Sequence, residues 1–186
     1  FTLPESIRTL DRKKFILVMS LTMIRIPLAL LFTLLFATVD DASLRLWFGL
    51  AILTCIELSD GLDGYLARRF KVASEAGAMF DPYTDSLSRL IVFYTYAVNG
   101  FALMAVPMVM AIRDVTVAYC RIILARHKVS VAALKSGKIK AIVQAVAAFI
   151  LCLSPWFVPF TGDILYPIVS WIVIIATAAS CLEYIR

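Results

Sequence analysis

Charged residues are scarce in this chain, and their scarcity excludes an ordinary water-soluble domain. Only 17% of the 186 residues are Asp, Glu, Lys or Arg, while 62% are hydrophobic, whereas soluble domains carry roughly 25% charged residues. Several apolar stretches reach or approach the roughly 20 residues that a helix needs to cross the hydrocarbon core of a bilayer. Such long runs predict helices rather than a barrel. The sequence therefore predicts an integral, multi-pass membrane protein.

Cysteine and histidine are also sparse. The four cysteines all lie in apolar stretches, without C-x-x-C or Cys/His spacing: Cys55, Cys120, Cys152 and Cys181. They are predicted to be small core residues rather than disulfide partners or zinc ligands. The single histidine, His127, lies in a basic connection and is interpreted as a solvated loop residue. No repeat, low-complexity tract or second domain is visible, so residues 1–186 are predicted to form one membrane domain.

The apolar runs predict an all-α bundle of about six transmembrane helices. Their approximate bounds are 15–39, 42–67, 77–98, 101–124, 139–157 and 164–184. Pro155 and Pro159 are expected to break the fifth helix, because proline lacks an N–H group and clashes with the preceding turn. Residues 1–14 are polar and basic with apolar residues at helical spacing, which predicts a short N-terminal interfacial helix on the membrane lipid.

Basic residues are unevenly divided between the predicted connections. One side would carry the N-terminal segment, the connections after the second and fourth helices, and the C-terminus; the other would carry Asp40, Asp41, Arg45 and Asp163. The positive-inside rule then predicts that both termini, and the candidate site around the second connection, face the cytoplasm. The plasma membrane, such as a bacterial inner membrane, is the expected location. The net charge of +5 is interpreted as a surface for anionic substrates and lipids, with no nucleic-acid partner.

Four aspartates stand in apolar sequence around the second predicted connection. Asp60 and Asp63 are three residues apart, and Asp81 and Asp85 are four apart, so each pair projects from one face of a helix. Four unneutralised carboxylates at a membrane face would repel one another and lose much hydration. A divalent cation relieves both costs, and all-oxygen ligands favour Mg²⁺, Mn²⁺ or Ca²⁺ over zinc. Arg68, just past the first pair, indicates a phosphate that shares the metal.

The arrangement D-G-x-D-G-x-x-A-R, then eight residues, then G-x-x-x-D-x-x-x-D resembles the signature of the CDP-alcohol phosphatidyltransferase family. All nine specified positions are met: Asp60, Gly61, Asp63, Gly64, Ala67, Arg68, Gly77, Asp81 and Asp85. The resemblance implies a metal-dependent enzyme that transfers a phosphatidyl-type group from a CDP-linked lipid to an alcohol and releases CMP. It also implies a homodimer.

The same resemblance implies roles for individual residues. The implied ligands of Mg²⁺ or Mn²⁺ are Asp60, Asp63, Asp81 and Asp85, and Asp85 is also the implied general base. The implied CDP-lipid contacts are Asp60, Gly61, Gly64, Arg68 and Gly77. A second family pattern, L-T-x-x-R followed by Pro27, adds Thr22 and Arg25 to these contacts, although Met19 stands where asparagine is common. Arg25 is expected to face the bundle interior or a phosphate, and snorkelling to the surface is the alternative.

A further set of residues bears on the acceptor alcohol. The segments R-D-V at 113–115, Arg121, and G-K-I-K at 137–140 with Gln144 resemble the branch of the family that uses glycerol 3-phosphate, although Ala141 stands where threonine is common. The candidate ligands of the acceptor phosphate are Arg113, Arg121, Lys138 and Lys140. The predicted reaction transfers the phosphatidyl group of CDP-diacylglycerol to glycerol 3-phosphate, giving phosphatidylglycerophosphate and CMP, a step of phospholipid biosynthesis.

Other interpretations of the same residues stay open. The acceptor can be inositol phosphate, serine or another polar alcohol. A divalent-cation transporter also gathers carboxylates among membrane helices, usually near the bilayer midplane. A purely structural set of buried ion pairs is disfavoured, because four acids and one arginine do not balance. Arg89, one turn after Asp85, is a candidate partner for that carboxylate, and the role of Glu57 is left undecided.

Overall fold

In a computed structural model of the chain, the described residues are 9–70, 75–126, 135–161 and 164–185. Within these ranges the chain is almost entirely helical, which confirms the predicted all-α class. The helices are α1 (Thr9–Met23), α2 (Arg25–Thr38), α3 (Ala42–Phe70), α4 (Glu75–Val98), α5 (Ala105–Arg126), α6 (Lys135–Thr161) and α7 (Leu165–Ile185).

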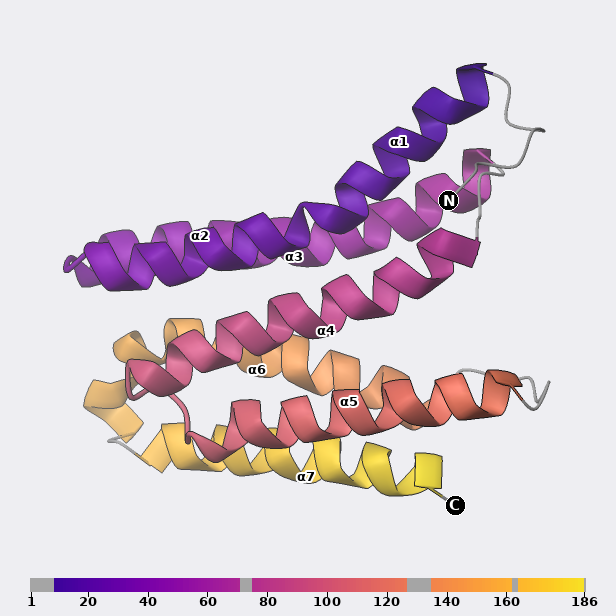
Figure 1. The fold of residues 1–186 in the computed structure, drawn as a ribbon. Helices are drawn as coiled ribbons and strands as arrows, with labels where there is room; N and C mark the ends of the chain where they lie inside the picture. Colours follow the sequence, from indigo (N-terminus) through magenta and orange to yellow (C-terminus); the bar gives the residue numbers. More distant parts are fainter. Residues whose placement is uncertain (1–8, 71–74, 127–134, 162–163, 186) are drawn as a thin grey trace.

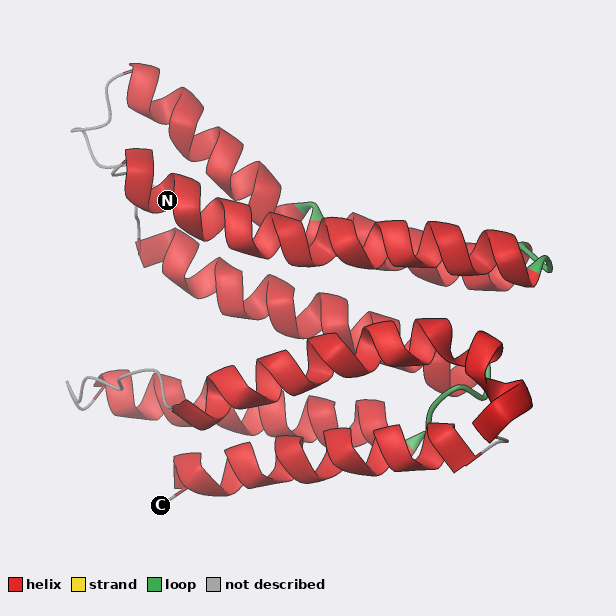
Figure 2. Ribbon diagram, turned by 180° about the vertical axis from the view of Figure 1, so that it is seen from behind, coloured by secondary structure: helices red, strands yellow, loops and turns green. Residues whose placement is uncertain are grey.

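The helices form a bundle with α4 at its centre (Figure 1). On one side α1, α2 and α3 lie together, and on the other side lie α5, α6 and α7, an arrangement that is equally clear from behind (Figure 2). Helix α2 packs against both α3 and α4, while α4 also packs against α5 and α6. The position of α2 is important for the site, because a side chain from its first turn can enter between α3 and α4.

Among the described residues, four helical segments are long and apolar enough to cross a membrane. They are Lys13–Thr38, Ala42–Phe70, Gly137–Phe157 and Leu165–Leu182. Helices α4 and α5, with 24 and 22 residues, are not among these four segments. The helix-bundle prediction is therefore confirmed, and membrane crossing by α4 and α5 stays a prediction.

The prediction that Pro155 and Pro159 break the fifth helix is wrong. Helix α6 runs from Lys135 to Thr161 through both prolines. Pro155 lacks the N–H group that would bond the Leu151 carbonyl, but the buried Ser154 hydroxyl donates to that carbonyl at 2.5 Å. The orphaned acceptor is thus satisfied locally, which lets the helix continue.

The short interfacial helix over residues 1–14 stays a prediction. Residues 1–8 lie outside the described residues, and residues 9–14 belong to α1, which continues without a break to Met23. The break comes at Ile24 instead, where α1 passes into α2 at an angle (Figure 1). Pro27 accounts for it, because this residue cannot donate to the Met23 carbonyl one turn earlier.

The turn after α4 contains Asn99 and Gly100, and the next helix begins later than predicted. Gly100 has a positive φ of 79°, a conformation that favours glycine. Helix α5 then begins at Ala105 rather than near residue 101. Phe101 instead packs edge-on against Phe36 and Tyr166, because the intervening segment folds back onto the aromatic core.

Tyr96 lies at the centre of this core. Its ring contacts Phe32, Phe36 and Phe93 with centroid distances of 5.4, 5.8 and 6.2 Å. Its buried hydroxyl donates a hydrogen bond to the Ala148 carbonyl at 2.7 Å. This hydrogen bond connects α4 to α6.

Tyr96→Phe is expected to lower the free energy of unfolding by about 0.5–1.5 kcal/mol, because it removes a buried hydrogen bond and keeps the ring packing. The thermal midpoint in detergent measures the effect. Tyr94→Phe is the matched control, since Tyr94 is 54% exposed. An equal loss of stability in both variants would show that the buried hydrogen bond of Tyr96 does not stabilise the fold.

Candidate active site

Three of the four motif aspartates converge where the end of α3 approaches the start of α4. Asp60 and Asp63 come from α3 and Asp81 comes from α4, and one carboxylate oxygen of each lies within 4.8 Å of the others. We call these three residues the carboxylate cluster. Oxygen donors of this kind are the preferred ligands of Mg²⁺ and Mn²⁺, so the donor set fits the predicted metal.

Arg25, the first residue of α2, inserts into the carboxylate cluster. Its side chain is fully buried, with Nη1 at 2.9 Å from an Asp60 oxygen and Nη2 at 3.0 Å from an Asp81 oxygen. Nη2 also contacts Asp63, and the Thr22 hydroxyl donates to the same Asp63 carboxylate at 2.7 Å. Arg25 therefore faces the bundle interior, as expected, and the snorkelling alternative is wrong.

Among the described residues, the negative charge of the carboxylate cluster exceeds the positive charge that is paired with it. Arg25 supplies one positive charge against three carboxylates. The Asp63 side chain is only 5% exposed, whereas Asp60 and Asp81 are 41% and 51% exposed. The two open carboxylates thus offer a divalent cation both negative charge and access, which supports a metal site over a closed set of ion pairs.

Arg25→Met is expected to lower the free energy of unfolding by about 3–5 kcal/mol, because it leaves buried carboxylate charge without its partner. The thermal midpoint in detergent is the measurement. Added Mg²⁺ should recover part of the loss, since a cation can replace the missing positive charge. Arg69→Met, at an exposed arginine of α3, is the control, and a comparable loss there would contradict the interpretation.

Asp85 stands apart from the carboxylate cluster, one turn further along α4. Arg89 Nε donates to its Oδ1 at 2.7 Å, which confirms the predicted ion pair. Arg89 also contacts a Glu57 oxygen at 3.3 Å. The undecided role of Glu57 is thereby resolved in part: it pairs with the arginine that holds Asp85, and sequence spacing alone gave no signal for this contact between helices.

The motif glycines and Arg68 lie where a ligand could reach them. A Cβ added at Gly61 or Gly64 would meet nothing within 4 Å, so these positions border open space. Arg68 is exposed, and its Nε donates to the Gly64 carbonyl at 3.0 Å. Gly77 lies half-buried in the first turn of α4. The space beside Gly61 and Gly64 is therefore available to a bound group.

The four candidate ligands of the acceptor phosphate fall into two environments. Arg113 of α5 and Lys140 of α6 are buried and contact the same Asp114 oxygen at 2.8 and 3.1 Å. Arg113 Nε also donates to the Ser180 hydroxyl of α7 at 3.0 Å. The other two, Arg121 and Lys138, are exposed on α5 and α6.

Sequence reasoning missed that Asp114 joins two of these cations. Asp114 follows Arg113 directly in the family pattern, but Lys140 lies 26 residues away. Spacing along the chain therefore gives no sign of this contact. The structure thus brings Arg113 and Lys140 together around one carboxylate.

The comparisons with known proteins agree with the signature. A sequence model of the CDP-alcohol phosphatidyltransferase family matches residues 15–182. A Mycoplasma genitalium protein named CDP-diacylglycerol–glycerol-3-phosphate 3-phosphatidyltransferase is 36% identical over 104 residues, covering 56% of this chain and 44% of that protein. A Cereibacter sphaeroides protein of the same name is 32% identical over 111 residues, covering 58% and 50%. The chain spans about half the length of the curated relatives that it matches.

Proposed function

Since the chain belongs to the CDP-alcohol phosphatidyltransferase family, we propose that it transfers the phosphatidyl group of CDP-diacylglycerol to glycerol 3-phosphate. The products are phosphatidylglycerophosphate and CMP. The observation that carries the proposal is the convergence of Asp60, Asp63 and Asp81 at the junction of α3 and α4. The names of the matched relatives support glycerol 3-phosphate as the acceptor.

The residues of the site have complementary tasks in this reaction. Asp60, Asp63 and Asp81 would hold Mg²⁺ or Mn²⁺, which supplies positive charge for the leaving phosphate. Thr22 and Arg25 keep the Asp63 carboxylate in place, and Arg68 would contact the pyrophosphate of the CDP-lipid.

Asp85 is proposed as the general base that takes the proton from the attacking hydroxyl of the acceptor. It is the motif aspartate that lies outside the carboxylate cluster, and its carboxylate is directed by Arg89. A cation bound by the cluster would therefore leave Asp85 free to act as a base. A contact between Asp85 and a second cation is also compatible with the family roles.

The position of the cluster suits a reaction between a lipid and a water-soluble molecule. Figure 1 shows that α3 ends and α4 begins at the same end of the bundle as the end of α5 and the start of α6. Basic residues concentrate at this end, so we propose that it faces the cytoplasm. A cation transporter is disfavoured, because such proteins usually place their carboxylates near the midplane. We also propose a homodimer, on the family resemblance.

The direct test is CMP release by the purified protein in detergent with CDP-diacylglycerol, Mg²⁺ and a panel of acceptors. Glycerol 3-phosphate is expected to be the best acceptor, with phosphatidylglycerophosphate identified by mass spectrometry. Higher rates with serine, inositol phosphate or an uncharged alcohol would contradict the acceptor assignment. Cation flux into proteoliposomes without CMP release would favour the transporter instead.

The exposed cations Arg121 and Lys138 are expected to set the affinity for the acceptor. Arg121→Ala or Lys138→Ala should raise KM for glycerol 3-phosphate about ten- to hundredfold, because each loses one charge-assisted contact with phosphate. KM for the CDP-lipid should change far less. Arg45→Ala, at the start of α3 and the other end of the bundle, is the control. An effect on the CDP-lipid alone would show that these residues do not bind the acceptor.

A further inference from the structure

Arg89 connects three helices through its three guanidinium nitrogens. Its Nε donates to Asp85 on α4 at 2.7 Å, its Nη1 donates to the Ala141 carbonyl on α6 at 2.9 Å, and its Nη2 donates to Glu57 on α3 at 3.3 Å. The residue is 8% exposed. A buried arginine with every nitrogen engaged has little freedom to rotate, because the guanidinium group is planar and rigid.

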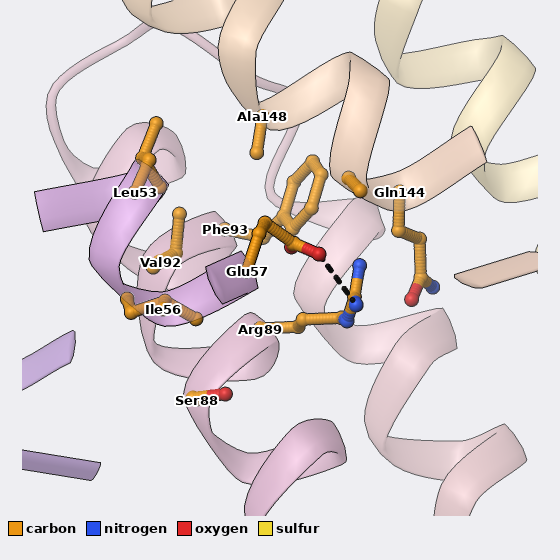
Figure 3. A pocket seen from close by; sticks show the side chains of 10 residues that line it. Leu53, Ile56, Glu57, Ser88, Arg89, Val92, Phe93, Gln144 and Ala148 are labelled. Carbon is orange, nitrogen blue, oxygen red and sulfur yellow. Dashed lines mark hydrogen bonds and ion pairs between the residues drawn. The ribbon is translucent and has the colours of Figure 1, made fainter. Parts of the chain in front are cut away.

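The guanidinium group borders a pocket between α3, α4 and α6, as Figure 3 shows. Glu57 approaches Arg89 from one side of this pocket and Gln144 lies on the other. Gln144 is fully buried, and its Oε1 atom has no hydrogen-bond partner in the described part of the chain. Gln144 Oε1 is therefore an unpaired acceptor on the side of the pocket opposite Glu57.

We propose that Arg89 and Glu57 are positioning residues for Asp85. Arg89 holds the Asp85 carboxylate in the direction in which it meets the acceptor hydroxyl, and Glu57 prevents the guanidinium group from turning toward Gln144. The inference rests on the proposed function, in which Asp85 is the base. It adds two residues outside the nine signature positions to the machinery of the reaction.

The geometry explains why this task needs an arginine. Arg89 must bond a carboxylate on its own helix while it is anchored to two other helices, and only a forked planar group presents fixed donors in these directions. A lysine would keep the charge but would offer a single, rotatable ammonium group. Glu57 accepts one hydrogen bond from Arg89 Nη2. A glutamine at this position can accept the same bond through its amide oxygen, so it can replace Glu57 in part.

Steady-state kinetics of four variants test the inference. Arg89→Lys is expected to lower kcat about ten- to hundredfold, because a small misplacement of a reacting group is costly. Glu57→Leu should lower kcat about tenfold for the same reason, and Glu57→Gln should retain most of the activity. KM for both substrates should stay within about twofold, since binding is not affected. The double variant Glu57→Leu/Arg89→Lys should lose no more than Arg89→Lys alone.

Thermal midpoints of the same variants separate positioning from folding, and Arg45→Lys is the matched control for the arginine substitution. Unchanged kcat in Arg89→Lys and Glu57→Leu, or a rise in KM alone, would overturn the inference. Losses that multiply in the double variant would also overturn it, because the two residues would then act independently. If Arg89→Lys does not fold, the inference is tested by comparing kcat of Glu57→Leu with kcat of Glu57→Gln. Equal values would contradict it.

The unmodified protein distinguishes this inference from the proposed function. Absence of CMP release with every acceptor contradicts the proposed function and the inference with it. Normal CMP release by the unmodified protein together with normal kcat in the variants contradicts the inference alone.

Discussion

Asp85→Asn is expected to abolish measurable CMP release while leaving the binding of divalent cation and CDP-lipid largely intact. Asparagine has the same size, and its amide oxygen can still accept the hydrogen bond that Arg89 Nε donates to Asp85 at 2.7 Å. It cannot take a proton from the acceptor hydroxyl. Loss of a general base typically costs about 10²- to 10⁴-fold in rate.

The matched comparison is Asp60→Asn or Asp81→Asn. Both residues belong to the carboxylate cluster, so these variants should lose affinity for the cation as well as activity. Titration with Mn²⁺ followed by electron paramagnetic resonance measures cation binding without turnover. Near-normal turnover of Asp85→Asn across the pH range would refute its assignment as the base. Loss of Mn²⁺ binding in Asp85→Asn would identify it as a cation ligand instead.

Removal of divalent cation is expected to stop the reaction completely, and addition of Mg²⁺ or Mn²⁺ should restore it. Without the cation, three carboxylates share the single positive charge of Arg25. The negatively charged pyrophosphate of the CDP-lipid would then approach a site that is itself negatively charged. Undiminished CMP release in excess chelator would rule out the proposed metal site.

The thermal midpoint in chelator is the control for this experiment. The fold should persist without added cation, because Arg25 connects α2 to both α3 and α4. A cooperative loss of structure in chelator would mean that lost activity reports unfolding rather than an empty site. In that case activity would have to be compared at temperatures below the midpoint.

Local patterns determined much of this protein from the sequence alone. The apolar runs predict the helix bundle, because a bilayer requires helices whose backbone groups bond internally. The spacings of Asp60 with Asp63, and of Asp81 with Asp85, place each pair on one helical face. The ion pair between Asp85 and Arg89 lies within one turn of α4. All of these relationships depend only on residues that are close in sequence.

The fold was less predictable where one side chain compensates for another. Pro155 ordinarily interrupts a helix, but Ser154 satisfies the carbonyl that the proline leaves unpaired. The reverse holds at Ile24, where the helix breaks although the predicted first span ran through it. Both outcomes depend on the local geometry around a proline, which residue type alone does not specify.

Only the tertiary structure determined which charged residues on different helices pair with one another. Arg25 reaches the carboxylate cluster because α2 packs against both α3 and α4. Asp85 lies outside that cluster and pairs with Arg89. Glu57 joins Arg89 across 32 residues, and Asp114 joins Lys140 across 26. The physical reason is that buried charges must find partners wherever packing brings opposite charges together, and that choice depends on how the helices are arranged rather than on spacing along the chain.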